Sequence, residues 1–144
     1  MRFRSGPGVL LIGVAMTFVV SAALPIWAHH SPPSGTYSDT FTDIQGVVTE
    51  VRLIQPHAWI ILDVKGDEPP IWNLEATSGT GLQRIGVTPE YVKPGDTVKA
   101  RCRRVIEGQR HSPPYNDCLL GFLKAKDGTV KDWSGNNAPA PADF

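Results

Sequence analysis

The stretch 46–65, GVVTEVRLIQPHAWIILDVK, decides the fold expected for this chain. Apolar and polar residues alternate in its first half, and a Gln-Pro pair then separates that half from a second alternating run. A period of two is typical of β-strands that bury one face, so we predict two strands joined by a turn at 55–56. The residues expected to face the core are Val47, Val51, Leu53, Ala58, Ile60, Leu62 and Val64.

Shorter runs of the same kind continue this pattern along the chain. We predict strands at 71–76, 97–106 and about 117–125. Between the first two, Leu82 and Ile85 are three residues apart and indicate a helix of one to two turns. The expected fold class is all-β with a small α insert. This order of elements favours a five-stranded antiparallel barrel of the OB type, and a sandwich of the same strand count is the alternative.

The beginning of the chain has the three parts of an export signal. Two arginines come first, an uninterrupted apolar run covers 9–20, and small residues follow it. We expect a signal peptide at 1–28 that is cut after Ala28, with cuts after Trp27 or Ala23 as alternatives. Counted from Gly8 to Ala28, the uncharged run before this cut has 21 residues. That is enough to span a bilayer at roughly 20 residues, so an inner-membrane anchor is a further alternative. In each case the rest of the chain is expected in the periplasm.

Removing 28 residues from 144 leaves 116, the length of one domain with a modest core. We expect an extended lead-in at 29–40, an OB-like barrel domain at 41–130 and a disordered tail at 131–144, which is rich in Asn, Pro and Ala. Two of the 14 Lys and Arg leave with the signal and all 14 Asp and Glu remain, so the exported part has a formal charge of −2. This balance argues against nucleic-acid binding, and we expect a monomer.

The two cysteines, Cys102 and Cys118, are expected to form a structural disulfide in an oxidising compartment. A hairpin that places them directly opposite each other also pairs Arg104 with Asn116. The closed loop would stabilise the fold by about 3 kcal/mol in the chain-entropy account. Two buried free thiols are the alternative. No CxxC spacing is present, so a thioredoxin-like role is unsupported.

Five motifs in a fixed order carry a resemblance to a known family. They are AHHS, GVVTEVRLIQPHAWIILDV, WNLEA, LQRIG and VTPEYVKPGDTV, and the resemblance covers the chain from His29 to about Gly128. Together they resemble an uncharacterised family of small bacterial periplasmic proteins, known only as a domain of unknown function. The resemblance implies an OB-like barrel and a signal cut just before the two histidines, and it implies no activity. Gln55 replaces the asparagine usual before Pro-His, and the cysteine pair is not part of the family pattern.

Histidine supplies the candidate metal chemistry. With the cut after residue 28, the chain would begin with His29, whose amine and ring nitrogen can chelate one ion, and His30 follows. A third nitrogen from His57 would suit square-planar Cu(II) or Ni(II) if the lead-in folds back over the barrel. The possible cofactor is therefore Cu(II). The alternatives are a solvated chain end for the histidine pair and a plain turn residue for His57. The fourth histidine, His111, is expected to be a loop residue.

A possible binding surface is formed by Trp59, Ile61 and Trp72. The leading hypothesis is a non-catalytic module that binds a small ligand or an envelope protein there. A copper-binding protein and a structural accessory subunit of an envelope complex are the alternatives. We find no catalytic constellation and do not expect an enzyme. Basic residues of the fourth strand form a stripe that suits either solvent or an anionic lipid or polymer; they are Lys99, Arg101, Arg103 and Arg104.

Overall fold

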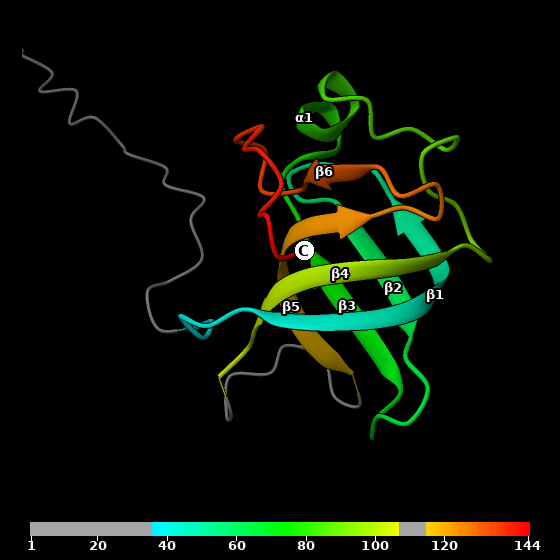
Figure 1. Ribbon diagram of the computed structural model, residues 1–144, viewed down its shortest axis with the longest axis vertical. Coiled ribbons are helices and arrows are strands. Elements are labelled where there is room, and N and C mark those ends of the chain that lie inside the picture. Colours follow the sequence, from blue (N-terminus) through cyan, green and yellow to red (C-terminus); the bar gives the residue numbers. More distant parts are fainter. Residues whose placement is uncertain (1–35, 107–114) are drawn as a thin grey trace, which may run out of the picture. The chain divides into compact units, whose positions relative to one another are not determined.

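The computed structural model describes residues 36–106 and 115–144. Figure 1 shows a small barrel of strands with one short helix at its end. In chain order the elements are β1 (Thr42–Arg52), β2 (Trp59–Asp63), β3 (Ile71–Glu75), α1 (Gly79–Arg84), β4 (Thr97–Arg104), β5 (Asn116–Lys124) and β6 (Val130–Asp132). The predicted signal peptide, His29, His30 and His111 lie outside the described residues.

The strands form one closed sheet in the order β3-β2-β1-β4-β5-β6, and β3 also pairs with β5. This pairing closes the first five strands into a barrel, with α1 inserted between β3 and β4, which is the arrangement of an OB fold. The predicted OB-like barrel is therefore confirmed. Two details differ from the expectation: β3 and β5 run parallel, and a sixth strand, β6, extends the sheet beyond β5. Periodicity reveals neither, because it does not say which strands meet when a sheet closes.

A β-bulge in β1 changes which residues face the core. Val48 lies opposite Leu62, but the next paired residue, Glu50, lies opposite Ile61, so Thr49 is an extra residue in β1. The extra residue shifts the alternation by one position. Val48 is consequently 1% exposed whereas Val47 is 38% exposed, and the prediction that Val47 faces the core is wrong.

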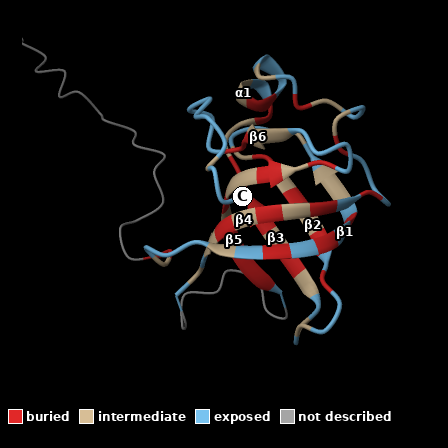
Figure 2. Cartoon of the chain, viewed as in Figure 1, coloured by how far each residue is buried: buried red, intermediate tan, exposed pale blue. Residues whose placement is uncertain are grey.

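The core lies inside the barrel, where the buried sides of the strands meet (Figure 2). The inward side of the second predicted strand is confirmed, since its four apolar residues, Ala58, Ile60, Leu62 and Val64, are all buried. Trp72 and Trp133 are the largest fully buried side chains. Within the described residues, no helix is long and apolar enough to cross a membrane.

The segment 131–144 differs from the disorder that its composition predicts. Trp133 is fully buried in the core, and its backbone N–H donates to the carbonyl of Gly121 at 2.7 Å. The carboxylate of Asp132 accepts from the backbone N–H groups of Ser134 and Ala138, each at 2.8 Å. One buried indole and one buried carboxylate therefore anchor a stretch whose remaining residues are mostly small and polar.

Cys102 and Cys118 form the expected disulfide between β4 and β5. Their strand register differs from the expectation. Cys102 lies opposite Leu120 and Cys118 lies opposite Arg104, with an irregularity between Arg101 and Cys102. The cysteines are thus diagonal neighbours and not direct partners. The register at the cysteines differs by two residues from the expected one, and the irregularity adds a shift of one residue on the Arg101 side.

Candidate functional site

The outer side of β2, β3 and β5 carries a group of mixed apolar and polar side chains, here called the outer face. In the β2–β3 ladder Trp59 lies opposite Glu75 and Ile61 opposite Asn73, and β5 adds Asp117 beside Asn73. Their sequence neighbours point into the core, and side chains alternate along a strand, so these five residues share the solvent side. Trp59 and Ile61 are only partly buried there.

Trp72 does not belong to this surface. It pairs with Leu62, is 1% exposed, and donates from Nε1 to the Asp67 carboxylate at 2.8 Å. The guanidinium of Arg104 lies 4.8 Å from its ring centre. The structure therefore brings Trp59 and Ile61 together as predicted, whereas the placement of Trp72 beside them was wrong. The reason is the alternation of β3, in which Trp72 and Leu74 are the inward residues.

Two carboxylates on the outer face are buried. Glu75 is 9% exposed and Asp117 is 6% exposed, although both lie on the solvent side of the barrel. Buried carboxylates are costly unless they are paired. Asp117 accepts from the side-chain amide of Asn73 at 3.2 Å. Glu75 uses both oxygens: Oε2 accepts from the Tyr37 hydroxyl at 2.8 Å, and Oε1 pairs with Nδ1 of His57.

Tyr37 reaches Glu75 because the segment before β1 runs along the end of β4. Tyr37 bridges to Val105. On either side of it, Ile106 N–H donates to the Thr36 carbonyl at 2.9 Å and Ser38 N–H donates to the Arg104 carbonyl at 2.8 Å. Burial first, and then the bond to the Glu75 carboxylate, raises the pKa of Tyr37 well above its ordinary value. The hydroxyl consequently stays protonated and remains a donor.

His57 lies in the loop between β1 and β2, and its side chain is 31% exposed. Because Glu75 holds Nδ1, Nε2 is the ring nitrogen left for another partner. A carboxylate on one imidazole nitrogen fixes the orientation of the ring, as it does for histidines that bind metals. The arrangement is therefore chemically suited to present one nitrogen ligand at the edge of the outer face.

The metal site expected from the sequence is represented here by His57 alone. Within residues 36–106 and 115–144, no three His, Cys, Asp or Glu side chains are grouped closely enough to hold an ion. Sequence reasoning missed Glu75 and Tyr37. A signal existed for Glu75, which follows the inward Leu74 and is therefore an outward residue of WNLEA. No local pattern marks Tyr37, which precedes the first strand.

The predicted basic stripe on β4 is partly neutralised by carboxylates. Asp43 on β1 pairs with Lys99 at 2.9 Å and with Arg101 at 2.6 Å. The bond from Arg101 lowers the pKa of Asp43 from 3.8 to about 2, and Lys99 adds to this effect. Arg103 lies over the ring of Phe41, 5.9 Å from its centre. The stripe is thus a set of paired cations and not an open row of positive charge.

Comparison with known proteins supports the resemblance seen in the motifs. No curated protein matches the chain. A family model matches residues 15–113, which include β1 to β4, α1 and the loop that holds His57. The match covers more than half of the chain and therefore establishes the relationship. The chain belongs to the family of unknown function DUF6152.

Proposed function

We propose that this protein is a non-catalytic periplasmic binding module that takes its ligand on the outer face. The observation that carries the proposal is the buried network of His57, Glu75 and Tyr37 beside the partly exposed Trp59. OB folds bind their ligands on the β2–β3 surface and the adjoining loops. This is an analogy of fold, and the outer face occupies the corresponding strands.

The chemistry of the outer face selects against polyanions. Glu75 and Asp117 place negative charge where an OB fold that binds nucleic acid needs cations. The indole of Trp59 offers an apolar ring, and Asn73 offers amide donors and an acceptor beside it. An uncharged ligand that combines apolar ring faces, which can stack on Trp59, with hydroxyl groups, which can bond to Asn73, fits this surface. A neutral oligosaccharide is such a ligand.

The periplasmic location rests on two features of the chain. Its first 28 residues have the composition of an export signal. The disulfide between Cys102 and Cys118 is compatible with an oxidising compartment. Mass spectrometry of the exported protein tests this part, because it identifies the first residue and the redox state of the cysteines.

Titration of the ¹⁵N-labelled processed protein with tri-N-acetylchitotriose tests the ligand class. We expect amide shifts centred on β2 and β3, and Trp59→Ala should weaken binding at least about tenfold through loss of ring stacking. Phe41→Ala is the matched control, because Phe41 is an exposed aromatic residue next to β4. Shifts confined to other surfaces, or equal effects of the two substitutions, would contradict the proposed site.

A second candidate function is Cu(II) binding by His29, His30 and His57. One observation favours it: the carboxylate that orients His57 also binds Tyr37, which lies seven residues after His30. Seven residues span at most about 25 Å when extended, so the length of chain permits the histidine pair to reach His57. The amine and ring of His29 would then supply two nitrogens and His57 Nε2 a third.

Cu(II) titration of the processed protein, followed by electron paramagnetic resonance, tests this candidate. The variants His29→Ala with His30→Ala, and His57→Ala alone, should each weaken binding by at least about tenfold. His111→Ala is the control and should bind as the wild type does. If His57→Ala leaves the Cu(II) affinity and the spectrum unchanged, the barrel contributes no ligand and this candidate function is wrong.

A further inference from the structure

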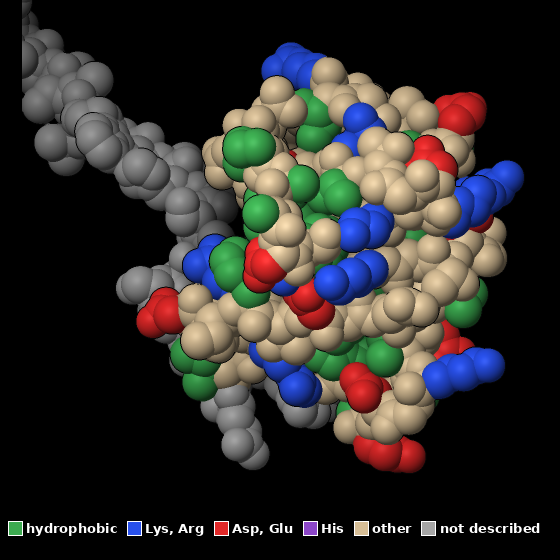
Figure 3. All heavy atoms as spheres, viewed as in Figure 1, with side chains coloured by type: hydrophobic (Ala, Val, Ile, Leu, Met, Phe, Trp, Pro, Cys, Tyr) green, Lys and Arg blue, Asp and Glu red, His purple; other side chains and the backbone are tan. Residues whose placement is uncertain are grey.

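The outer side of β4 and β5 carries three cations and one aromatic side chain, which are neighbours in the strand register. We call this group, formed by Lys99, Arg101, Lys124 and Phe122, the cationic surface. In the structure it is covered by the last residues of the chain, 141–144. Figure 1 shows the end of the chain lying over β4 and β5, and Figure 3 shows Lys and Arg side chains beside hydrophobic ones on this side of the molecule.

Phe144 fills the centre of the cationic surface. Its ring centre lies 4.7 Å from Lys99 Nζ, 5.0 Å from Arg101 Cζ and 5.3 Å from Lys124 Nζ. The Phe122 ring packs against it at 6.4 Å between centres, tilted by 50°. A ring face attracts cations through its quadrupole, and three cations around one ring form a cage for an aromatic side chain.

Asp143 supplies the matching charge. Its carboxylate accepts from Arg101 Nη1 at 2.7 Å, and the backbone carbonyl of Phe144 accepts from Lys124 Nζ at 2.6 Å. Apart from Asp143, Asp43 is the carboxylate that pairs with Lys99 and Arg101. When residues 141–144 leave, three cations therefore share one carboxylate, and the surface becomes suited to a new anionic group beside an aromatic one.

Beyond Ala138, whose backbone N–H is held by Asp132, exposed residues join the covering segment to the barrel. The side chain of Asp143 is 76% exposed, and residues 134–140, which connect it to the anchored Trp133, are all exposed. This connection has no regular secondary structure, and it contains Pro139. A short, mostly solvated connection gives an effective local concentration in the millimolar range, which favours closure without making it permanent.

We propose that the cationic surface is a binding site for partner peptides in which an acidic residue precedes an aromatic one. Asp143 and Phe144 occupy this site in the free protein and show the chemistry that it accepts. A partner segment of the same kind takes their place, with its carboxylate on Arg101 and its ring between Lys99 and Lys124. The site lies on β4 and β5 and does not depend on the function proposed for the outer face.

Fluorescence anisotropy tests the proposal with a labelled, C-terminally amidated peptide APAPADF, the sequence of residues 138–144. The full-length double variant Asp143→Asn, Phe144→Ala leaves the surface open. It should bind the peptide about tenfold more tightly than the wild type, because the covering segment no longer competes. A peptide with Asn and Ala in place of its last two residues should not bind.

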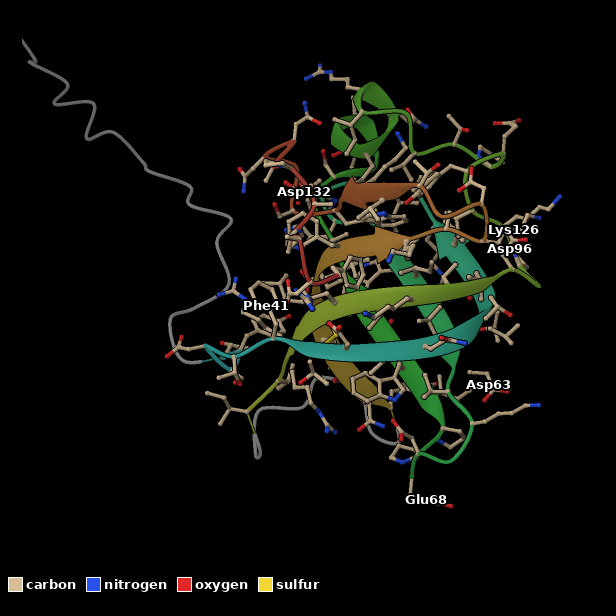
Figure 4. All side chains as sticks on the ribbon, viewed as in Figure 1. Phe41, Asp63, Glu68, Asp96, Lys126 and Asp132 are labelled. Carbon is tan, nitrogen blue, oxygen red and sulfur yellow. A yellow bond between two sulfur atoms is a disulfide. The ribbon has the colours of Figure 1, made fainter. Side chains whose placement is uncertain are left out.

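Two further substitutions in the open variant locate the site. Arg101→Gln should weaken peptide binding at least about tenfold, since it removes the carboxylate contact. Lys124→Gln should also weaken peptide binding, because it removes one of the three cations around the aromatic ring of the peptide. This second variant keeps the test valid if Arg101→Gln perturbs folding. Lys126→Gln is the matched control, because Lys126 pairs with Asp96, and Figure 4 shows these two residues side by side. Near-ultraviolet circular dichroism of the buried tryptophans confirms folding of each variant.

Equal binding by the wild type and the open variant, or binding unaffected by both Arg101→Gln and Lys124→Gln, would overturn the proposal. Light scattering tests whether residues 141–144 of a second copy of this chain occupy the cationic surface. A wild-type dimer that becomes a monomer in the open variant would show exchange of this segment between copies, and would replace the assignment to a partner peptide.

Discussion

Oε1 of Glu75 pairs with Nδ1 of His57 on the outer side of the barrel, and the second oxygen of the same carboxylate accepts a hydrogen bond from Tyr37. The pair joins the β1–β2 loop to β3, and Tyr37 adds the segment that precedes β1. Three parts of the chain that are far apart in sequence thus depend on one buried carboxylate. Glu75 is therefore the most informative residue to substitute.

Glu75→Ala is expected to lower the free energy of unfolding by about 1–3 kcal/mol, because the buried Tyr37 hydroxyl loses its acceptor. Glu75→Gln should cost less, since the amide oxygen can still accept from Tyr37. Urea unfolding followed by tryptophan fluorescence measures both. Glu50→Gln is the control: Glu50 pairs with Arg52 in an exposed position, so its replacement should change the free energy much less than Glu75→Ala does. Similar losses for Glu75→Ala and Glu50→Gln would argue against a buried network.

Asp43 is expected to make stability depend on acid pH. Its pKa in the folded protein is about 2, below the ordinary 3.8. A depressed pKa contributes stability above the unfolded value, and this contribution disappears as the pH falls from about 4 toward 2. The difference in unfolding free energy between the wild type and Asp43→Asn should therefore shrink from about pH 5 to about pH 2. Asp39→Asn, at an exposed position of the lead-in, controls for the loss of a carboxylate as such. A difference that stays constant with pH would refute the prediction.

Replacing both cysteines, Cys102→Ser with Cys118→Ser, should lower the free energy of unfolding by about 3 kcal/mol. The disulfide links residues 16 apart, and loops of this length restrict the unfolded chain by that amount. A reductant should shift the urea midpoint of the wild type to that of the variant and leave the variant unchanged. A wild-type midpoint that does not respond to the reductant under denaturing conditions would contradict the link.

Trp133→Ala should destabilise the protein by about 3–5 kcal/mol, because it empties a fully buried indole site. It should also release the covering segment, whose connection begins at Trp133. Limited proteolysis after residue 133 should accordingly be faster in this variant than in the wild type. Asn136→Ala, at an exposed position of the same connection, is the control. Equal cleavage of the wild type and Trp133→Ala would show that the indole does not anchor the segment.

The sequence-based prediction was more accurate for the second half of the stretch 46–65 than for its first half. The inward residues of β2 were correct because every residue of β2 is paired with β1 and with β3, and the extra residue of the bulge lies in β1. In β1 one extra residue, Thr49, reversed the alternation and placed Val48 inward instead of Val47. A bulge has no strong sequence signal here, since Val-Val-Thr-Glu-Val is compatible with either face.

The candidate site was predictable in part. Trp59 and Ile61 follow from the alternation of β2, and the same rule applied to β3 would have turned Trp72 inward with Leu74. The partnership of His57 with Glu75 requires the β2–β3 register, in which Trp59 lies opposite Glu75. Neither residue indicates the other within its own stretch of sequence.

The sequence by itself determined the first five strands, the short helix, the OB-like barrel and the disulfide, because these follow from local periodicity, turn residues and cysteine spacing. Three features were decided only by the tertiary structure. They are the parallel pairing of β3 with β5, the contacts among His57, Glu75 and Tyr37, and the position of the Phe144 ring among three cations. These contacts join segments that become neighbours when the barrel closes. Their free energy depends on burial and charge pairing across that closure, which no local pattern of residues specifies.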